Sequence, residues 1–149
     1  EYGIVDEPGL PMLEEALEKY PRLKFIGHSQ PFWHEISQDA KPDLKSRMEW
    51  GKGPVKEGGR LVCLMRNYKN LYADLSANSG GCAIMRDEKF GLQFLEEFQD
   101  RLMFGTDMVN TDMVFPLGEW LDRQYQEGKL SVQAYRKICF ENAKKIFQL

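Results

Sequence analysis

The chain has 149 residues, of which 42% are hydrophobic and 29% charged, a composition typical of one globular domain with a proper core and not of a disordered chain. The formal net charge of −3 and the lack of basic runs argue against nucleic acid as a partner. No apolar run approaches the roughly 20 residues that span a bilayer, so we expect no membrane partner. The opening residues show no signal segment, and Cys63, Cys82 and Cys139 form no C-x-x-C pair. We therefore expect free thiols and a cytoplasmic location.

The first third of the chain predicts a helix, a short strand and a long loop. Apolar residues at helical spacing predict a helix over residues 10–20, which Pro21 ends. Residues 24–27 predict a short strand that ends at His28, followed by a loop carrying two aromatic residues. Residues 35–59 are polar and rich in Gly and Pro, and they predict a long loop with a helical turn capped by Asp43.

The rest of the chain repeats an alternation of helix and strand. We predict a helix over residues 60–68, a strand over 71–77, a flexible turn at 78–81 and a helix capped by Asp87. The next strand covers 102–106 and ends at Asp107. Two helices follow: the first carries Leu117 to Tyr125, and Ser131 caps the second.

This alternation with apolar strands predicts an α/β fold with a parallel sheet covered by helices. Three strands make a small sheet with two open edges, which natural domains avoid leaving bare. The sequence also begins at Glu1 without a methionine. We therefore expect the missing neighbours to come from an absent part of the chain, from a homo-oligomer or from a rearrangement, and we favour truncation.

Four motifs in order resemble a known family. They are YPRLKFIGH at 20–28, NLYADLS at 70–76, LMFGTD at 102–107 and ENAKKIF at 141–147. Together they resemble the carboxyl-terminal part of the amidohydrolase superfamily, and most closely its amidohydrolase-related branch, which includes aminocarboxymuconate semialdehyde decarboxylase. The resemblance covers essentially all 149 residues.

The resemblance implies the carboxyl-terminal portion of a metal-dependent (β/α)8 barrel, with the three strands as its sixth, seventh and eighth. His28 then ends the sixth strand and Asp107 the eighth. In the family this aspartate binds or borders a divalent metal and takes the proton of the metal-bound water. The histidine orients substrate or water, or ligates a metal. The resemblance thus implies His28 and Asp107 as catalytic residues and metal ligands, with zinc as the expected metal and manganese as the alternative.

The sequence departs from the family in its histidines. The His-x-His of the first strand and a histidine of the fifth are absent, and only His28 and His34 occur. A catalytic zinc site wants three protein ligands, and a typical barrel has about 250 residues. We expect residues 1–149 to form a single fragment, inactive alone, with 35–59 as a polar loop at the barrel mouth.

Other residues have two interpretations each. Phe32 and Trp33 either wall a substrate pocket or pack under the long loop. Ser76 is a candidate substrate contact, whereas Asp74 on the same strand face is expected to be structural and to need an arginine or a hydroxyl as partner. His34 is expected to meet solvent or a local hydrogen bond.

These features predict part of a metal-dependent hydrolase in which a metal-bound water attacks a C–N or C–O bond of a small-molecule substrate. Two alternatives stay open: a metal-dependent decarboxylase of the same superfamily, and a non-catalytic α/β binding module in which His28, Phe32 and Trp33 hold a ligand.

Overall fold

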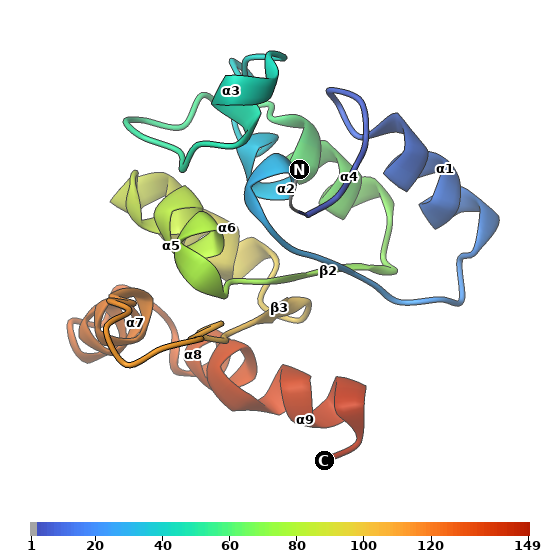
Figure 1. The fold of residues 1–149 in the computed structure, drawn as a ribbon. Helices are drawn as coiled ribbons and strands as arrows, with labels where there is room; N and C mark the ends of the chain where they lie inside the picture. The colour runs from blue at the N-terminus through green and yellow to red at the C-terminus, as the bar shows by residue number, and fades with distance from the viewer. Residues whose placement is uncertain (1–2) are drawn as a thin grey trace.

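A computed structural model of the protein describes residues 3–149, and a three-stranded parallel sheet lies at its centre (Figure 1). The strands are β1 (Phe25–Gly27), β2 (Leu71–Asp74) and β3 (Leu102–Met103), in the order β1-β2-β3. Phe25 pairs with Leu71, and Ala73 pairs with Leu102 on its other side. The predicted α/β class with parallel strands is confirmed, and the open sheet with its helices is consistent with part of a (β/α)8-like barrel.

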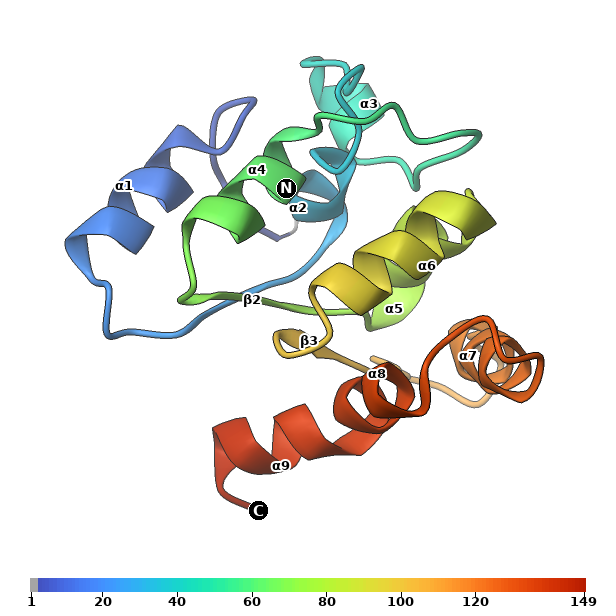
Figure 2. The ribbon, with the colours of Figure 1, turned by 180° about the vertical axis from the view of Figure 1, so that it is seen from behind.

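Helices occupy most of the remaining chain. They are α1 (Pro11–Lys19), α2 (Gln30–His34), α3 (Leu44–Arg47), α4 (Arg60–Asn67), α5 (Ala77–Met85), α6 (Glu88–Glu97), α7 (Leu117–Gln126), α8 (Val132–Arg136), the π-helical segment η1 (Lys137–Glu141) and α9 (Asn142–Phe147). In both views α1 to α6 lie above the strands, α8 and α9 lie below β3, and α7 lies to one side of β3 (Figures 1 and 2). None of the helices in residues 3–149 combines the length and apolar character needed to cross a membrane.

The predicted caps of three helices are present. The side chain of Asp43 accepts the backbone N–H of Ser46 at 3.0 Å, and that of Asp87 accepts the N–H of Phe90 at 3.1 Å. The Ser131 hydroxyl accepts the N–H of Ala134 at 3.1 Å. These bonds satisfy amide groups that the first turn of a helix leaves without partners, so the starts of α3, α6 and α8 follow from sequence.

Two helices replace segments that were predicted to be irregular. The loop expected after His28 is largely α2, and the flexible turn expected at 78–81 lies inside α5. Glycine disfavours helix by propensity, but a Cβ on Gly80 would lie only 2.7 Å from the Cα of Leu75. Close packing of α5 on the end of β2 therefore requires glycine and overrides its low helix propensity.

The strands are shorter than predicted, and the final helix is interrupted. The predicted strands at 71–77 and 102–106 reduce to the four residues of β2 and the two of β3. The π-helical segment η1 interrupts the last helix. Within it, the carbonyl of Ile138 accepts the N–H of Phe104 at 2.8 Å. This bond ties the C-terminal helix to the chain just beyond β3.

The polar segment 35–59 is anchored to the rest of the fold. The N–H of Val55 donates to the Asp87 side chain at 3.1 Å, and the N–H of Gln38 donates to the carbonyl of Lys56 at 2.9 Å. Val55 is buried. These bonds fix the backbone of the segment, which borders a cavity between residues 34–54 and the end of α5.

The outer edge of β1 has no strand beside it among residues 3–149. A cavity of about 300 Å³ borders this edge. Its lining residues are mainly apolar: Gly3, Ile4, Leu13, Phe25, Ile26, Gly27, His28 and Phe32. Sheet edges in natural domains are normally covered, and the apolar lining of this cavity lies along the uncovered edge of β1.

Candidate functional site

Polar residues meet where the parallel strands end. His28 follows β1, Asp74 is the last residue of β2, and Ser76 lies two residues further. The His28 Nδ1 atom lies 3.2 Å from both carboxylate oxygens of Asp74. The carboxyl ends of parallel strands are where α/β folds place their sites, so residues 46 positions apart form one cluster there.

The Asp74 carboxylate also accepts two bonds from Ser76. The Ser76 N–H donates to Oδ1 at 2.9 Å, and the Ser76 hydroxyl donates to the same oxygen at 2.5 Å. An ionised carboxylate can only accept, so the His28 Nδ1 must be the donor toward Asp74. A neutral His28 in this tautomer has its basic lone pair on Nε2. Asp74 thus fixes the tautomer and the orientation of the imidazole.

Ser76 does not have the geometry of a serine nucleophile. Its hydroxyl lies 3.3 Å from His28 Nδ1, on the same ring nitrogen that faces Asp74. In a Ser-His-Asp triad the nucleophile and the carboxylate contact opposite ring nitrogens. The cluster is therefore a histidine held by a carboxylate and a hydroxyl, and the predicted contact of Ser76 with substrate stays a prediction.

Asp107 lies beyond the end of β3 and is exposed. Within residues 3–149 no hydrogen bond or ion pair engages its side chain or joins it to His28. The structure therefore assembles His28, Asp74 and Ser76, and it leaves the role of Asp107 a prediction.

Each strand is followed by a residue in an unusual backbone conformation. Ser29 has φ 80°, Ala77 has φ 54° and Asp107 has φ 54°. Residues other than glycine rarely adopt positive φ, and such positions cluster at functional sites, where surrounding contacts hold them. All three lie within a few residues of the carboxyl ends of β1, β2 and β3, whereas Leu10 and Gln148, which also have positive φ, lie at helix ends.

We expect Ala77→Gly to change the free energy of unfolding by less than about 0.5 kcal/mol. Glycine removes about 1 kcal/mol of backbone strain from the left-handed conformation of the folded state. It also stabilises the unfolded state by a similar amount, because the unfolded chain gains conformational freedom. The same change at Ala73, buried in β2 with ordinary backbone angles, should cost about 1–2 kcal/mol. Urea unfolding of the two variants measures the difference, and equal losses would show that Ala77 is not strained.

The two aromatic candidates are packed into the core. Phe32 is fully buried and Trp33 is 2% exposed. The Trp33 Nε1–H donates to the Asp74 carbonyl at 3.2 Å, and a Cβ on Gly27 would overlap the Phe32 ring. Of the two roles that the sequence left open, packing is what these contacts show, and contact with substrate stays a prediction.

The described residues do not complete a metal centre. His28 and Asp107 have suitable donor atoms, but residues 3–149 contain no group of three or more His, Cys, Asp or Glu side chains placed to share an ion. A catalytic zinc site needs about three protein ligands. A resident metal would therefore take further ligands from outside these residues.

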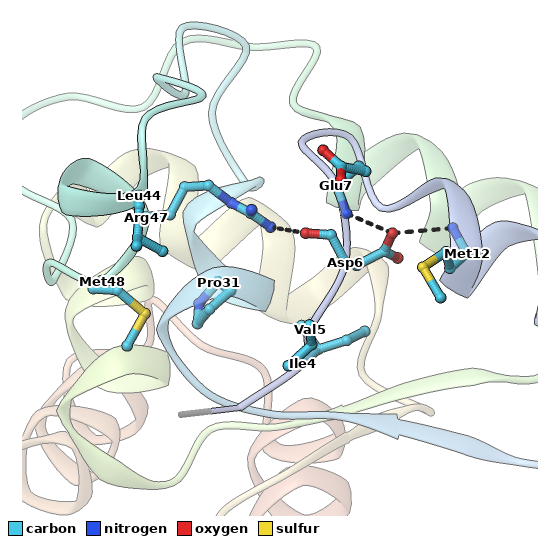
Figure 3. Close-up of a pocket in the computed structure, with 9 residues that line it drawn as sticks. All are labelled: Ile4, Val5, Asp6, Glu7, Met12, Pro31, Leu44, Arg47 and Met48. Atoms are coloured by element: carbon cyan, nitrogen blue, oxygen red, sulfur yellow. Dashed lines mark hydrogen bonds between the residues drawn. The ribbon is translucent and has the colours of Figure 1, made fainter. Parts of the chain in front are cut away.

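A second cavity, of about 210 Å³, lies between the N-terminal segment, α2 and α3 (Figure 3). The Asp6 carboxylate beside it accepts backbone N–H groups of Glu7, Met12 and Leu13 at 2.8–3.1 Å. Arg47 reaches across to donate to the Asp6 carbonyl at 2.7 Å. Ile4 lines both this cavity and the one beside His28, so the two adjoin.

The sequence did not predict the His28–Asp74 pair. A signal was present, because His28 follows β1 directly, Asp74 closes β2 and the two strands are parallel neighbours. What the sequence lacked was the register, which places Gly27 opposite Ala73 and so His28 beside Asp74. The hydroxyl partner expected for Asp74 is Ser76.

A model of the amidohydrolase family matches residues 4–149, which is nearly the whole chain. The chain belongs to the amidohydrolase family. Searches of the curated proteins and of the solved structures gave no significant match. Membership in this amidohydrolase family indicates an enzyme of the hydrolase or lyase type. A functional proposal for the chain has to give a role to the histidine–carboxylate pair at the carboxyl edge of its sheet.

Proposed function

We propose that this chain supplies one section of the active site of a hydrolase that acts on a small-molecule substrate by cleaving a C–N or C–O bond. The observation that carries the proposal is the His28 imidazole, oriented by Asp74 and Ser76 at the carboxyl edge of the sheet. The open edge of β1 supports the further proposal that residues 1–149 are the carboxyl-terminal portion of a barrel, whose other strands complete the site.

His28 is proposed to orient the reactants and to move a proton. With Nδ1 held by Asp74, the lone pair on Nε2 can accept a proton from water, and the protonated ring can donate one to a leaving group. Asp107, exposed on the loop after β3, is proposed as a second proton acceptor and as an oxygen ligand. Asp74 is a positioning residue in this scheme.

A divalent metal, zinc or manganese, belongs to the proposal only together with ligands from outside residues 3–149. Such an ion, when bound, lowers the pKa of a coordinated water to about 7. The side chains of His28 and Asp107 offer a nitrogen and an oxygen donor toward it. The remaining donors would come from the absent strands or from a second copy of the chain.

The test uses the protein expressed from its complete gene. Its metal content is measured by elemental analysis, and it is assayed against panels of amides, esters and lactones and, for the lyase alternative, against small carboxylic acids for release of CO2. We expect about one metal ion per active site and hydrolysis of at least one panel member. Decarboxylation instead of hydrolysis would assign the site to the lyase branch and overturn the hydrolase proposal.

Asp107 is tested in the same protein with Asp107→Asn. We expect at least a hundredfold lower turnover and a lower metal content, because the amide loses the charge and the basicity of the carboxylate. Asp112→Asn, a matched change on the same exposed loop, should leave both unchanged. Full activity of Asp107→Asn would remove Asp107 from the site, and absence of metal together with absence of any turnover would favour a non-catalytic binding module.

A further inference from the structure

A polar cavity of about 270 Å³ lies between segment 34–54 and the end of α5. Its lining is rich in charged and polar side chains: His34, Ser37, Asp39, Lys41, Ser46, Glu49, Trp50, Lys52 and Arg86. Nothing in the proposed catalytic role uses these residues, since His28 and Asp107 line no part of the cavity.

Arg86 is the residue that requires an explanation. Its side chain is half-buried, and its Nε atom is buried without a hydrogen-bond partner. Within residues 3–149 no hydrogen bond or ion pair engages its guanidinium. A buried nitrogen without a partner costs free energy, and burial lowers the pKa of Arg86. Nε is shielded from the cavity, so an anion there would meet the terminal nitrogens Nη1 and Nη2, which make no hydrogen bond within residues 3–149.

The Arg86 guanidinium packs against Gly51. It packs on Gly51 so closely that a Cβ at this position would overlap Nη1 and lie 3.1 Å from the Cζ atom of Arg86. A larger residue at position 51 would require the end of the Arg86 side chain to shift. The planar fork of Arg86 lines the cavity beside Gly51, and a guanidinium fork suits two-point binding of a carboxylate or phosphate.

The charges around the cavity favour an anion despite two acidic residues. Lys41, Lys52 and Arg86 supply three positive charges, against the carboxylates of Asp39 and Glu49. Asp39 accepts the Ser37 hydroxyl at 2.6 Å and forms no ion pair with Arg86 among the described residues. The lining side chains thus keep a positive excess of one charge, which the nearby carboxylate of Asp87 opposes, and the arginine is not neutralised by direct contact.

We propose that this cavity binds a small ligand that carries a carboxylate or phosphate group, held by the Arg86 fork and flanked by Lys41 and Lys52. Trp50 is 48% exposed and lines the same cavity, so it offers a flat surface for an aromatic or other planar part of the ligand. The proposal is independent of the catalytic one, because it uses none of the same residues.

The probes are phenyl phosphate and benzoate, titrated into the purified protein at fixed ionic strength and followed by calorimetry and by tryptophan fluorescence. Trp33 and Trp120 are 2% and 7% exposed, so the fluorescence change should come from Trp50. We expect saturable binding of at least one probe. The tighter probe identifies the anionic group as phosphate or carboxylate.

Two variants and one control make the assignment specific. Arg86→Met keeps the length of the side chain without its charge, and Gly51→Ala displaces the guanidinium while leaving its charge; each should weaken binding at least tenfold. Arg123→Ala removes an exposed charge on α7 and should bind as the parent does. Thermal unfolding checks that each variant is folded. Absence of saturable binding by both probes, or unchanged binding by folded Arg86→Met, would overturn the proposal.

Discussion

We expect His28→Gln to lower the turnover number of the complete enzyme by about a thousandfold, within the range of about 10²–10⁴ that general acid–base catalysis contributes. The glutamine amide can still donate to Asp74, so the 3.2 Å contact that places the side chain can be kept. It cannot accept and release a proton near neutral pH. Turnover is measured on the substrate found by the panel, with circular dichroism to verify folding.

The chain provides a matched control, since its other histidine has a different environment. His34 Nε2 donates to the backbone carbonyl of Lys41 at 2.9 Å on the polar segment. His34→Gln makes the same chemical change there, and we expect turnover within twofold of the parent. Equal turnover of the two variants would contradict a catalytic role for His28, whereas partial recovery of His28→Gln by added imidazole would support proton transfer.

Asp74→Asn separates positioning from proton transfer. An asparagine can present its N–H to Nδ1 and so favour the other tautomer, with the proton on Nε2. We expect a loss in turnover that approaches that of His28→Gln, with little change in KM, and no further loss in the double variant. Additive losses would show that Asp74 acts apart from His28.

The parts of this fold that the sequence predicts are those with a local cause. The apolar stripe of α1 and the side-chain caps of Asp43, Asp87 and Ser131 depend on residues three or four positions apart, and all are present. The alternation of buried Leu71 and Ala73 with partly exposed Tyr72 and Asp74 likewise needs only the period of a strand. Chain-local physics is sufficient for these elements.

The parts that escaped prediction depend on contacts between distant segments. Helix α5 contains two glycines and forms because Gly80 packs on the backbone of Leu75. The contact between Arg86 and Gly51 joins residues 35 positions apart in the sequence. The His28–Asp74 pair requires the β1–β2 register. Each depends on tertiary geometry that propensity and periodicity do not contain.

We expect Phe32→Ala to lower the free energy of unfolding by about 4 kcal/mol, as large-to-small changes of buried phenylalanines do. Phe32 is fully buried, packs edge to face on Trp33 with ring centroids 5.4 Å apart, and fills the space above Gly27. Its removal leaves a cavity against Gly27, the residue that precedes His28. Phe140→Ala, at a site 61% exposed, is the matched control and should cost less than about 1 kcal/mol.

The same experiment decides between the two roles of Phe32. If Phe32 packs the core, Phe32→Ala lowers the free energy of unfolding measured in urea. Any loss of turnover then follows from this loss of stability, because Gly27 and His28 lose the packing of the Phe32 ring. If Phe32 instead contacts substrate through the cavity that it lines beside His28, stability should change by less than 1 kcal/mol while KM rises. Complete burial and contact with Gly27 favour the first outcome. Phe32 also packs on Trp33, whose indole N–H donates to the carbonyl of Asp74, so the same packing supports the residue that holds His28.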